Sequence, residues 1–174
     1  MNTQEVMLER AIRKKALQAI CDHYPATLPL HAVIIACKAH SEAYSGIADT
    51  DVRRAIEYLE SCGHVERNAS GYRATSDGID SLGHRNDETL LRGIVLNAQY
   101  VMRGMVDLDM LKEYVGDCAQ AVRASEIIRA AAYLTDCKLS TQGAGMCWKI
   151  THHGIDYLQN VSEYREGVYR ASTL

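Results

Sequence analysis

Apolar residues recur along much of the chain at intervals of three and four, the spacing that places them on one face of an α-helix. Two stretches, starting at Val52 and Ile127, keep apolar residues at i, i+3, i+4 and i+7. After each, two short runs flank a turn with glycine, which is the pattern of a β-hairpin. The pattern predicts helices over 2–24, 29–44, 51–62, 76–82, 86–104, 107–118, 126–137 and 152–164, and hairpins over 64–75 and 138–151.

The same pattern of residues occurs twice, which indicates an internal duplication. The first block recurs at an offset of 75 residues. Its shared residues are Arg54, Ala55, Tyr58, Leu59 and Cys62, which match Arg129, Ala130, Tyr133, Leu134 and Cys137 in order. The second block recurs at an offset of 76 residues. Its shared residues are Thr75, Gly78, Ile79, Asp80 and Leu82, which match Thr151, Gly154, Ile155, Asp156 and Leu158 in order. Each unit therefore reads helix, helix, helix, strand, strand, helix.

Polar residues at the ends of the third helix predict how it starts and stops. A hydroxyl, Thr50 or Ser125, precedes a carboxylate, Asp51 or Glu126. We expect the hydroxyl to cap a free backbone N–H and the carboxylate to favour the positive end of the helix. Gly63 follows the first copy and is expected to be the residue just past its end.

The closing helices and the junction complete the predicted organisation. Thr75 or Ser76 in the first unit, and Thr151 in the second, are expected to cap the closing helices, and "SLGHRND" joins the two units. Asn2 with Glu5 forms a capping-box signature at the first helix. The predicted division is residues 1–85, residues 86–160, and a C-terminal helical extension over residues 161–174.

Composition excludes several classes of protein. The 174 residues carry 19 Lys and Arg against 22 Asp and Glu, a net charge of −3, unlike a strongly basic nucleic-acid protein. The charge is −1 over residues 1–85 (10 − 11) and −2 over residues 86–174 (9 − 11). Hydrophobic residues make up 47%, which is enough for a folded core. Without a transmembrane span or a signal peptide in the pattern, we expect a soluble, cytoplasmic protein that binds no membrane.

Motifs of enzymes and cofactor sites are missing from the sequence. There is no P-loop, GxGxxG, HExxH or GxSxG, and we expect neither an enzyme nor a cofactor. The one group that resembles a metal site is Cys137, Cys147, His152 and His153, but zinc sites favour closely spaced ligand pairs. The six cysteines are interpreted as small buried hydrophobes, with Cys62 and Cys137 at equivalent core positions. Trp148, which matches Tyr72, is also expected in the core.

The order of elements resembles the winged helix-turn-helix. The residues that carry the resemblance are "VRRAIEYLESCGHVE" and the hairpin exits "YRATSDGIDSL" and "WKITHHGIDYL". These exits are similar to the strand-to-helix ending of MarR-like and PadR-like regulators. The resemblance implies an α+β, mostly α fold of two tandem winged-helix units, each with three helices, a hairpin wing and a closing helix. Tandem winged helices also occur in replication initiators, phage packaging proteins and chromosome-partition adaptors.

In DNA-binding members of the superfamily the third helix enters the major groove and the wing contacts the backbone or the minor groove. Carried onto this chain, the resemblance assigns double-stranded DNA contacts to arginines and lysines of both units, because a guanidinium can grip guanine edges or phosphates. The candidates are Arg53, Arg54, Arg67, Arg73, Lys14, Lys15, Arg123, Arg129 and Lys149.

Two functions stay open at this point. The first is a DNA-binding transcriptional regulator or accessory factor of a phage or another mobile element. The second is a protein-interaction adaptor, or a component of a replication or packaging assembly, without strong DNA binding of its own. The carboxylates at the starts of the third helices favour the second, and the arginines of the first unit favour the first. The apolar spacing of the C-terminal helix permits a homodimer, and a monomer is equally consistent.

Overall fold

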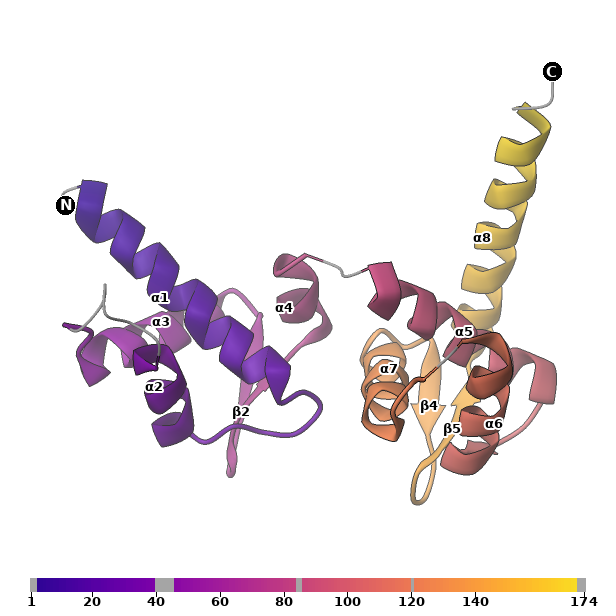
Figure 1. Ribbon diagram of the computed structural model, residues 1–174, viewed down its shortest axis with the longest axis horizontal. Coiled ribbons are helices and arrows are strands. Elements are labelled where there is room, and N and C mark those ends of the chain that lie inside the picture. The colour runs from indigo at the N-terminus through magenta and orange to yellow at the C-terminus, as the bar shows by residue number, and fades with distance from the viewer. Residues whose placement is uncertain (1–2, 40–45, 84–85, 120, 172–174) are drawn as a thin grey trace. The chain divides into compact units, whose positions relative to one another are not determined.

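The structure is a computed structural model that describes residues 3–39, 46–83, 86–119 and 121–171. It is α+β and mostly helical, as the sequence predicts. The chain divides into two compact units, Met1–His84 (unit 1) and Arg85–Leu174 (unit 2), and Figure 1 shows the elements of each.

The elements of unit 1 follow one another in the predicted order. They are α1 (Thr3–Asp22), α2 (Leu30–Lys38), α3 (Asp49–Ser61), β1 (Val65–Asn68), β2 (Gly71–Ala74) and α4 (Ser76–Ser81). Helix α1 contacts both α2 and α3, and α3 leads directly into the β1–β2 hairpin. The capping box expected at Asn2 and the end of the second predicted helix, residues 40–44, lie outside the described residues.

Unit 2 repeats this order with one addition. Its elements are α5 (Asn86–Met102), β3 (Val106–Asp107), α6 (Leu108–Cys118), α7 (Ala124–Asp136), β4 (Ser140–Gln142), β5 (Cys147–Ile150) and α8 (His152–Ala171). The short strand β3 was not predicted. It pairs with β5 in an antiparallel sheet of order β3-β5-β4.

Unit 1 holds a smaller version of the same third strand. Leu28 forms an antiparallel bridge with Tyr72 of β2, and each backbone N–H donates to the other residue's carbonyl, at 2.8 and 3.0 Å. In unit 2 the corresponding pair is Val106 and Trp148. Gly71 is required beside this bridge, because a Cβ there would lie 2.5 Å from the carbonyl oxygen of Leu28. Each hairpin is therefore anchored to the segment between the first two helices.

Each unit has its own apolar core, formed where the third helix packs on the first. In unit 1 the buried residues of α3 are Val52, Ala55, Ile56 and Leu59, the predicted apolar face. In unit 2 the equivalent face of α7 is Ile127, Ala130, Ala131 and Leu134. Trp148 is 1% exposed, which confirms that this aromatic belongs to the core.

The turn after the third helix is the same in both units. Gly63, at φ +74°, and Lys138, at φ +63°, both adopt the left-handed conformation just past the helix. The next residue, His64 or Leu139, donates its N–H to the carbonyl five positions back, that of Leu59 or Leu134, at 2.9 Å in each unit. This is a Schellman ending, and it confirms the role predicted for Gly63.

A threonine and a glycine then fix the closing helix against that turn. Thr75 Oγ1 accepts from Gly78 N (3.1 Å) and donates to the Gly63 carbonyl (2.7 Å). Thr151 Oγ1 makes the same two contacts, from Gly154 N (3.0 Å) and to the Lys138 carbonyl (2.7 Å). Both predicted caps are confirmed. This geometry explains why the hydroxyl recurs in both copies.

The predicted caps of the third helices are wrong. Each helix starts earlier than expected, after Ala48 or Arg123, and neither has a side-chain cap from a hydroxyl. Instead a carboxylate caps the end: Asp51 accepts from Ala48 N (3.0 Å), and Glu126 accepts from Arg123 N (2.8 Å). The carboxylate reaches back one turn to a free N–H, and its charge suits the positive end of the helix.

The cysteines are only partly the buried hydrophobes that we expected. Cys21 and Cys37 are buried, and burial raises the pKa of the Cys37 thiol. Cys62 is exposed because it is the cap that follows the last residue of α3, at the point where the chain turns away from the core. Its predicted core position is therefore wrong. Cys118 is also exposed.

Candidate nucleic-acid interface

The outward face of α3 carries one of the two arginines that the sequence singles out. Arg53 is exposed and lies one turn from Glu57, while its neighbour Val52 is buried. Among the described residues Arg53 forms no hydrogen bond or ion pair, although its charge helps to lower the pKa of the Asp49 carboxyl one turn back, and its N–H groups can donate to a ligand. The face also carries Thr50 and Glu60, both exposed. Its charge is mixed, with a single cation.

Arg54 points to a different place from Arg53. It lines a groove between α1 and α3, together with Glu5, Glu9 and Asp51. The sequence treats the two arginines as one pair, whereas the structure separates them onto the outward face and the groove. The reason is geometric: consecutive residues on a helix are about 100° apart, so only one of them can face directly outward.

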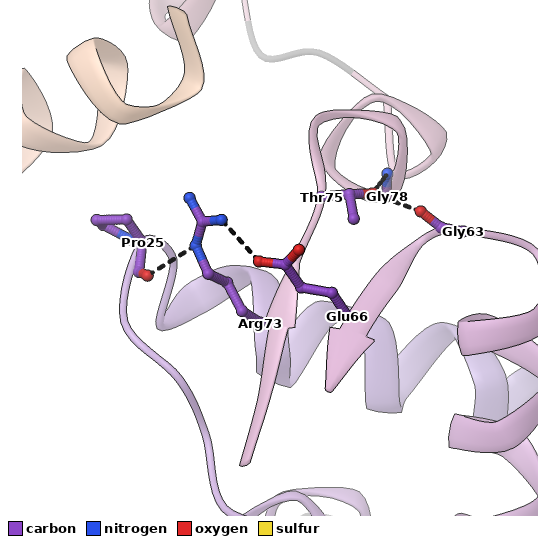
Figure 2. Close-up of polar contacts among 6 residues, drawn as sticks. All are labelled: Pro25, Gly63, Glu66, Arg73, Thr75 and Gly78. Carbon is purple, nitrogen blue, oxygen red and sulfur yellow. Dashed lines mark hydrogen bonds and ion pairs between the residues drawn. The ribbon is translucent and has the colours of Figure 1, made fainter. Parts of the chain in front are cut away.

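The β1–β2 hairpin also divides its two predicted arginines. Arg67 is exposed on β1, with its Cζ 5.9 Å from the centre of the Tyr72 ring. Arg73 of β2 is turned inward, as Figure 2 shows: its Nε donates to the Pro25 carbonyl at 3.1 Å, and its Nη1 to Glu66 at 2.8 Å. Arg73 thus ties the hairpin to the loop after α1.

The tip of this hairpin is polar and ordered by its own side chains. Asn68 Oδ1 accepts from the backbone N–H groups of Ser70 (2.9 Å) and Gly71 (3.1 Å). Asn68 and Ser70 are exposed. The hairpin therefore presents Arg67, an amide and a hydroxyl to solvent, a set of groups that suits contacts to phosphate oxygens.

The two predicted lysines of α1 lie in different surroundings. Lys14 is exposed and forms no hydrogen bond or ion pair with the described residues. Lys15 is half-buried and close enough to Cys37 to oppose, by its charge, the rise in the pKa of that thiol. Only Lys14 is a free surface cation of this pair.

The candidates in unit 2 are spread over three elements. Arg123 precedes α7 and pairs with Glu126 at 3.2 Å, a contact that lowers the pKa of that carboxyl. Arg129 lies on α7, where its Nε is 3.9 Å from Glu88 of α5. Lys149 is exposed on β5. These three do not form a common basic face in the contacts that the structure describes.

Two charged positions of α3 are apolar in α7. At the repeat offset of 75, Ile128 replaces Arg53 and Ala132 replaces Glu57. The hairpin of unit 2 also differs, because Met146 at its tip is 53% exposed. Met105 lies beside that hairpin, and a Cβ on Gly143 would be 2.2 Å from its Cε. Unit 2 therefore exposes two methionines at its hairpin, while Ile128 of α7 packs against the core of the unit.

An ion pair between two helices orders the start of α3. Lys38, the last residue of α2, donates to Asp49, the first residue of α3, and this contact lowers the pKa of the Asp49 carboxyl. It neutralises one of the carboxylates that the sequence reading counts against DNA contact at this helix start. Sequence reasoning missed the pair, because it spans eleven positions and depends on how α2 packs.

Two further properties bear on the choice of function. Within the described part of the chain, no three His, Cys, Asp or Glu side chains are grouped so as to hold a metal ion. Also within that part, no helix combines the length and apolar character needed to cross a membrane.

Comparison with known proteins assigns no family to the chain. No protein-family model matches the sequence, and no curated protein matches it.

Proposed function

We propose that each unit is a winged helix, and that the chain binds double-stranded DNA through unit 1. In this proposal α3 is the recognition helix and β1–β2 is the wing. The support for the fold is the order of elements and the third strand, a bridge at Leu28 in unit 1 and β3 in unit 2, which lies between the first two helices. The class of protein is a transcriptional regulator or an accessory factor of a mobile element.

The observation that carries the DNA proposal is the pair of free guanidiniums on unit 1. Arg53 projects from the outward face of α3, and Arg67 projects from the wing that follows it in the chain. Because the helix enters the major groove and the wing follows the backbone, one arginine can reach base edges while the other contacts phosphate. Arg73 ties the hairpin to Pro25, and Arg54 lines the groove, so neither belongs to the proposed DNA surface.

A second candidate function is supported by a different observation, the exposed methionines at the wing of unit 2. Met105 and Met146, which are 48% and 53% exposed, suit contact with protein better than contact with phosphates. The partner in this reading is either a second copy of the chain or another protein of a replication or packaging assembly. The two functions are compatible, because they use different units.

Binding to random duplex DNA over a series of salt concentrations tests the first function. Each phosphate that a protein cation neutralises contributes about −0.9 to the slope of log affinity against log salt. We expect a slope of about −2 or steeper from contacts at Arg53 and Arg67. Absence of binding at low salt would remove the DNA proposal and leave the protein-partner reading.

Light scattering tests the second function on the same sample. If the wing of unit 2 pairs with a second copy, Met146→Glu reduces the measured mass to that of a monomer, because the carboxylate would be buried in the interface without a partner, whereas Met146 is 53% exposed in the single chain. A wild-type chain that is already a monomer directs the search to a different protein.

A further inference from the structure

The groove between α1 and α3 of unit 1 is a candidate ligand site apart from the proposed DNA surface. Its volume is about 530 Å³, within the range of small-molecule pockets, about 300–1,000 Å³. Its apolar lining comes from Leu8, Ile12, Ala55 and Tyr58, and its charged lining from Glu5, Glu9, Arg13, Asp51 and Arg54. The two helices lie side by side in Figure 1.

Unit 2 carries the same set of side chains in a closed arrangement. Glu88 and Arg92 of α5 match Glu9 and Arg13 of α1 at an offset of 79. Arg129 and Tyr133 of α7 match Arg54 and Tyr58 of α3 at the repeat offset of 75. The carboxylate of Glu88 lies between the two arginines, 3.6 Å from Arg92 and 3.9 Å from Arg129. Arg92 is only 8% exposed, with its Cζ 3.5 Å from the centre of the Tyr133 ring.

In unit 1 the equivalent carboxylate serves one arginine only. Glu9 pairs with Arg13 at 3.0 Å, and the Cζ of Arg13 lies 4.1 Å from the centre of the Tyr58 ring. Arg54 forms no hydrogen bond or ion pair with the described residues, and Tyr58 is 47% exposed. Glu88 therefore bridges both arginines in unit 2, whereas Glu9 pairs with Arg13 alone in the contacts that the structure describes.

The charges of the groove narrow the chemistry of a ligand. A ligand carboxylate would pair with Arg54, because a guanidinium can donate two parallel hydrogen bonds to a carboxylate. The lining holds three carboxylates against two guanidiniums, so a simple anion would also meet repulsion. A ligand that carries an ammonium beside its carboxylate can pair with both the guanidinium and the carboxylates of the groove. An apolar side chain on that ligand would cover Leu8 and Tyr58, which are 40% and 47% exposed.

We propose that this groove binds a free α-amino acid with an apolar side chain. Its carboxylate is held by Arg54, its ammonium by the acidic lining, and its side chain by the apolar floor. The proposal does not depend on DNA binding, because Arg53 and Arg67 lie outside the groove lining.

Isothermal titration calorimetry of the full chain with L-leucine and L-phenylalanine tests the proposal. The expected result is binding at millimolar concentration or tighter, with N-acetyl-L-leucine and L-leucinamide each at least about tenfold weaker. A charge-assisted hydrogen bond is worth about 1.5–3 kcal/mol, which corresponds to a factor of about ten or more. No heat from either amino acid, or equal binding of the blocked analogues, would overturn the proposal.

Matched variants locate the site. Arg54→Gln is expected to weaken leucine binding at least about tenfold. Arg129→Gln, the same change at the equivalent position of unit 2, leaves it unaltered. Arg54 is exposed, so its substitution spares the core, and Leu8→Asn offers an independent change in the floor with a similar loss. Equal affinity of the wild type and both groove variants would place any binding elsewhere and refute the site.

Discussion

The two units share their turns and caps but differ in the surfaces built on them. Thr75 and Thr151 make the same pair of hydrogen bonds, with lengths that agree within 0.1 Å between the units. The exposed tip of the hairpin, by contrast, changes from Ser70 in unit 1 to Met146 in unit 2, at the offset of 76. Buried and backbone-bound positions keep the repeat, because each change there breaks a contact. Exposed positions are free to take on different chemistry.

The comparison predicts that the shared glycines are the most sensitive positions in either unit. A Cβ at Gly78 would lie 2.0 Å from the His64 carbonyl oxygen, and at Gly154 2.2 Å from that of Leu139. Backbone must move to accommodate either alanine, so we expect each Gly→Ala change to cost about 3 kcal/mol or more. Trp148, the single tryptophan, reports on unit 2 by fluorescence, and far-UV circular dichroism reports on both units. Retention of wild-type stability by both variants would contradict the shared packing.

Loss of the shared hydroxyls should have a smaller and nearly equal effect in the two units. Thr75→Val and Thr151→Val each remove a helix cap and a bond to the preceding turn. A cap is worth about 1 kcal/mol, so we expect about 1–2 kcal/mol for each variant in urea unfolding. Ser replacements, which keep the hydroxyl, are the matched controls. A large difference between the two units would show that their closing helices are not equivalent.

Substitution of the left-handed residue just past the third helix should change the stability of the two units in opposite directions. Gly63→Ala places a Cβ at φ +74° and should destabilise unit 1 by about 1 kcal/mol. Lys138→Gly relieves the same strain at φ +63° and should stabilise unit 2 by up to about 1 kcal/mol. Circular dichroism follows the first change and Trp148 fluorescence the second. The same sign in both units would rule out left-handed strain as the cause.

The smallest expected effect is a loss of stability of unit 2 as the pH falls. The hydrogen bonds from Arg123 lower the pKa of Glu126 in the folded chain, so its contribution to stability is present above the ordinary glutamate pKa of about 4.3. That contribution is lost as the pH falls through the lowered value. Glu126→Gln should therefore show a smaller fall in urea midpoint between pH 7 and pH 3. A fall identical to that of the wild type would exclude a role for this carboxylate.

Local signals in the sequence predict much of the fold. Periodicity predicts the helices, the Gly-containing turns predict both hairpins, and the repeated Thr-x-x-Gly predicts the caps at Thr75 and Thr151. The strand β3 escapes prediction because two residues carry no detectable alternation. The start of α3 was misplaced because Asp51 caps the backbone one turn earlier, where Ala48 carries no polar side chain.

The candidate interface is less accessible to sequence reasoning, because the fate of each arginine depends on distant contacts. Arg73 is held by the carbonyl of Pro25, 48 positions away, and no local pattern reveals that partner. Arg54 faces α1, a contact between helices that the repeat alone does not orient. The sequence therefore predicts the residue types of the surface, and packing decides which of them remain free.

A charge-matched pair of double variants tests the central claim, that unit 1 and not unit 2 contacts DNA. Arg53→Gln with Arg67→Gln and Arg123→Gln with Lys149→Gln each remove two positive charges from the chain. In fluorescence anisotropy with duplex DNA, we expect the first pair to lower affinity at least about tenfold and to flatten the salt slope by about one to two units, and the second to leave both unchanged. Equal losses from the two pairs, or a loss from the second alone, would contradict the account.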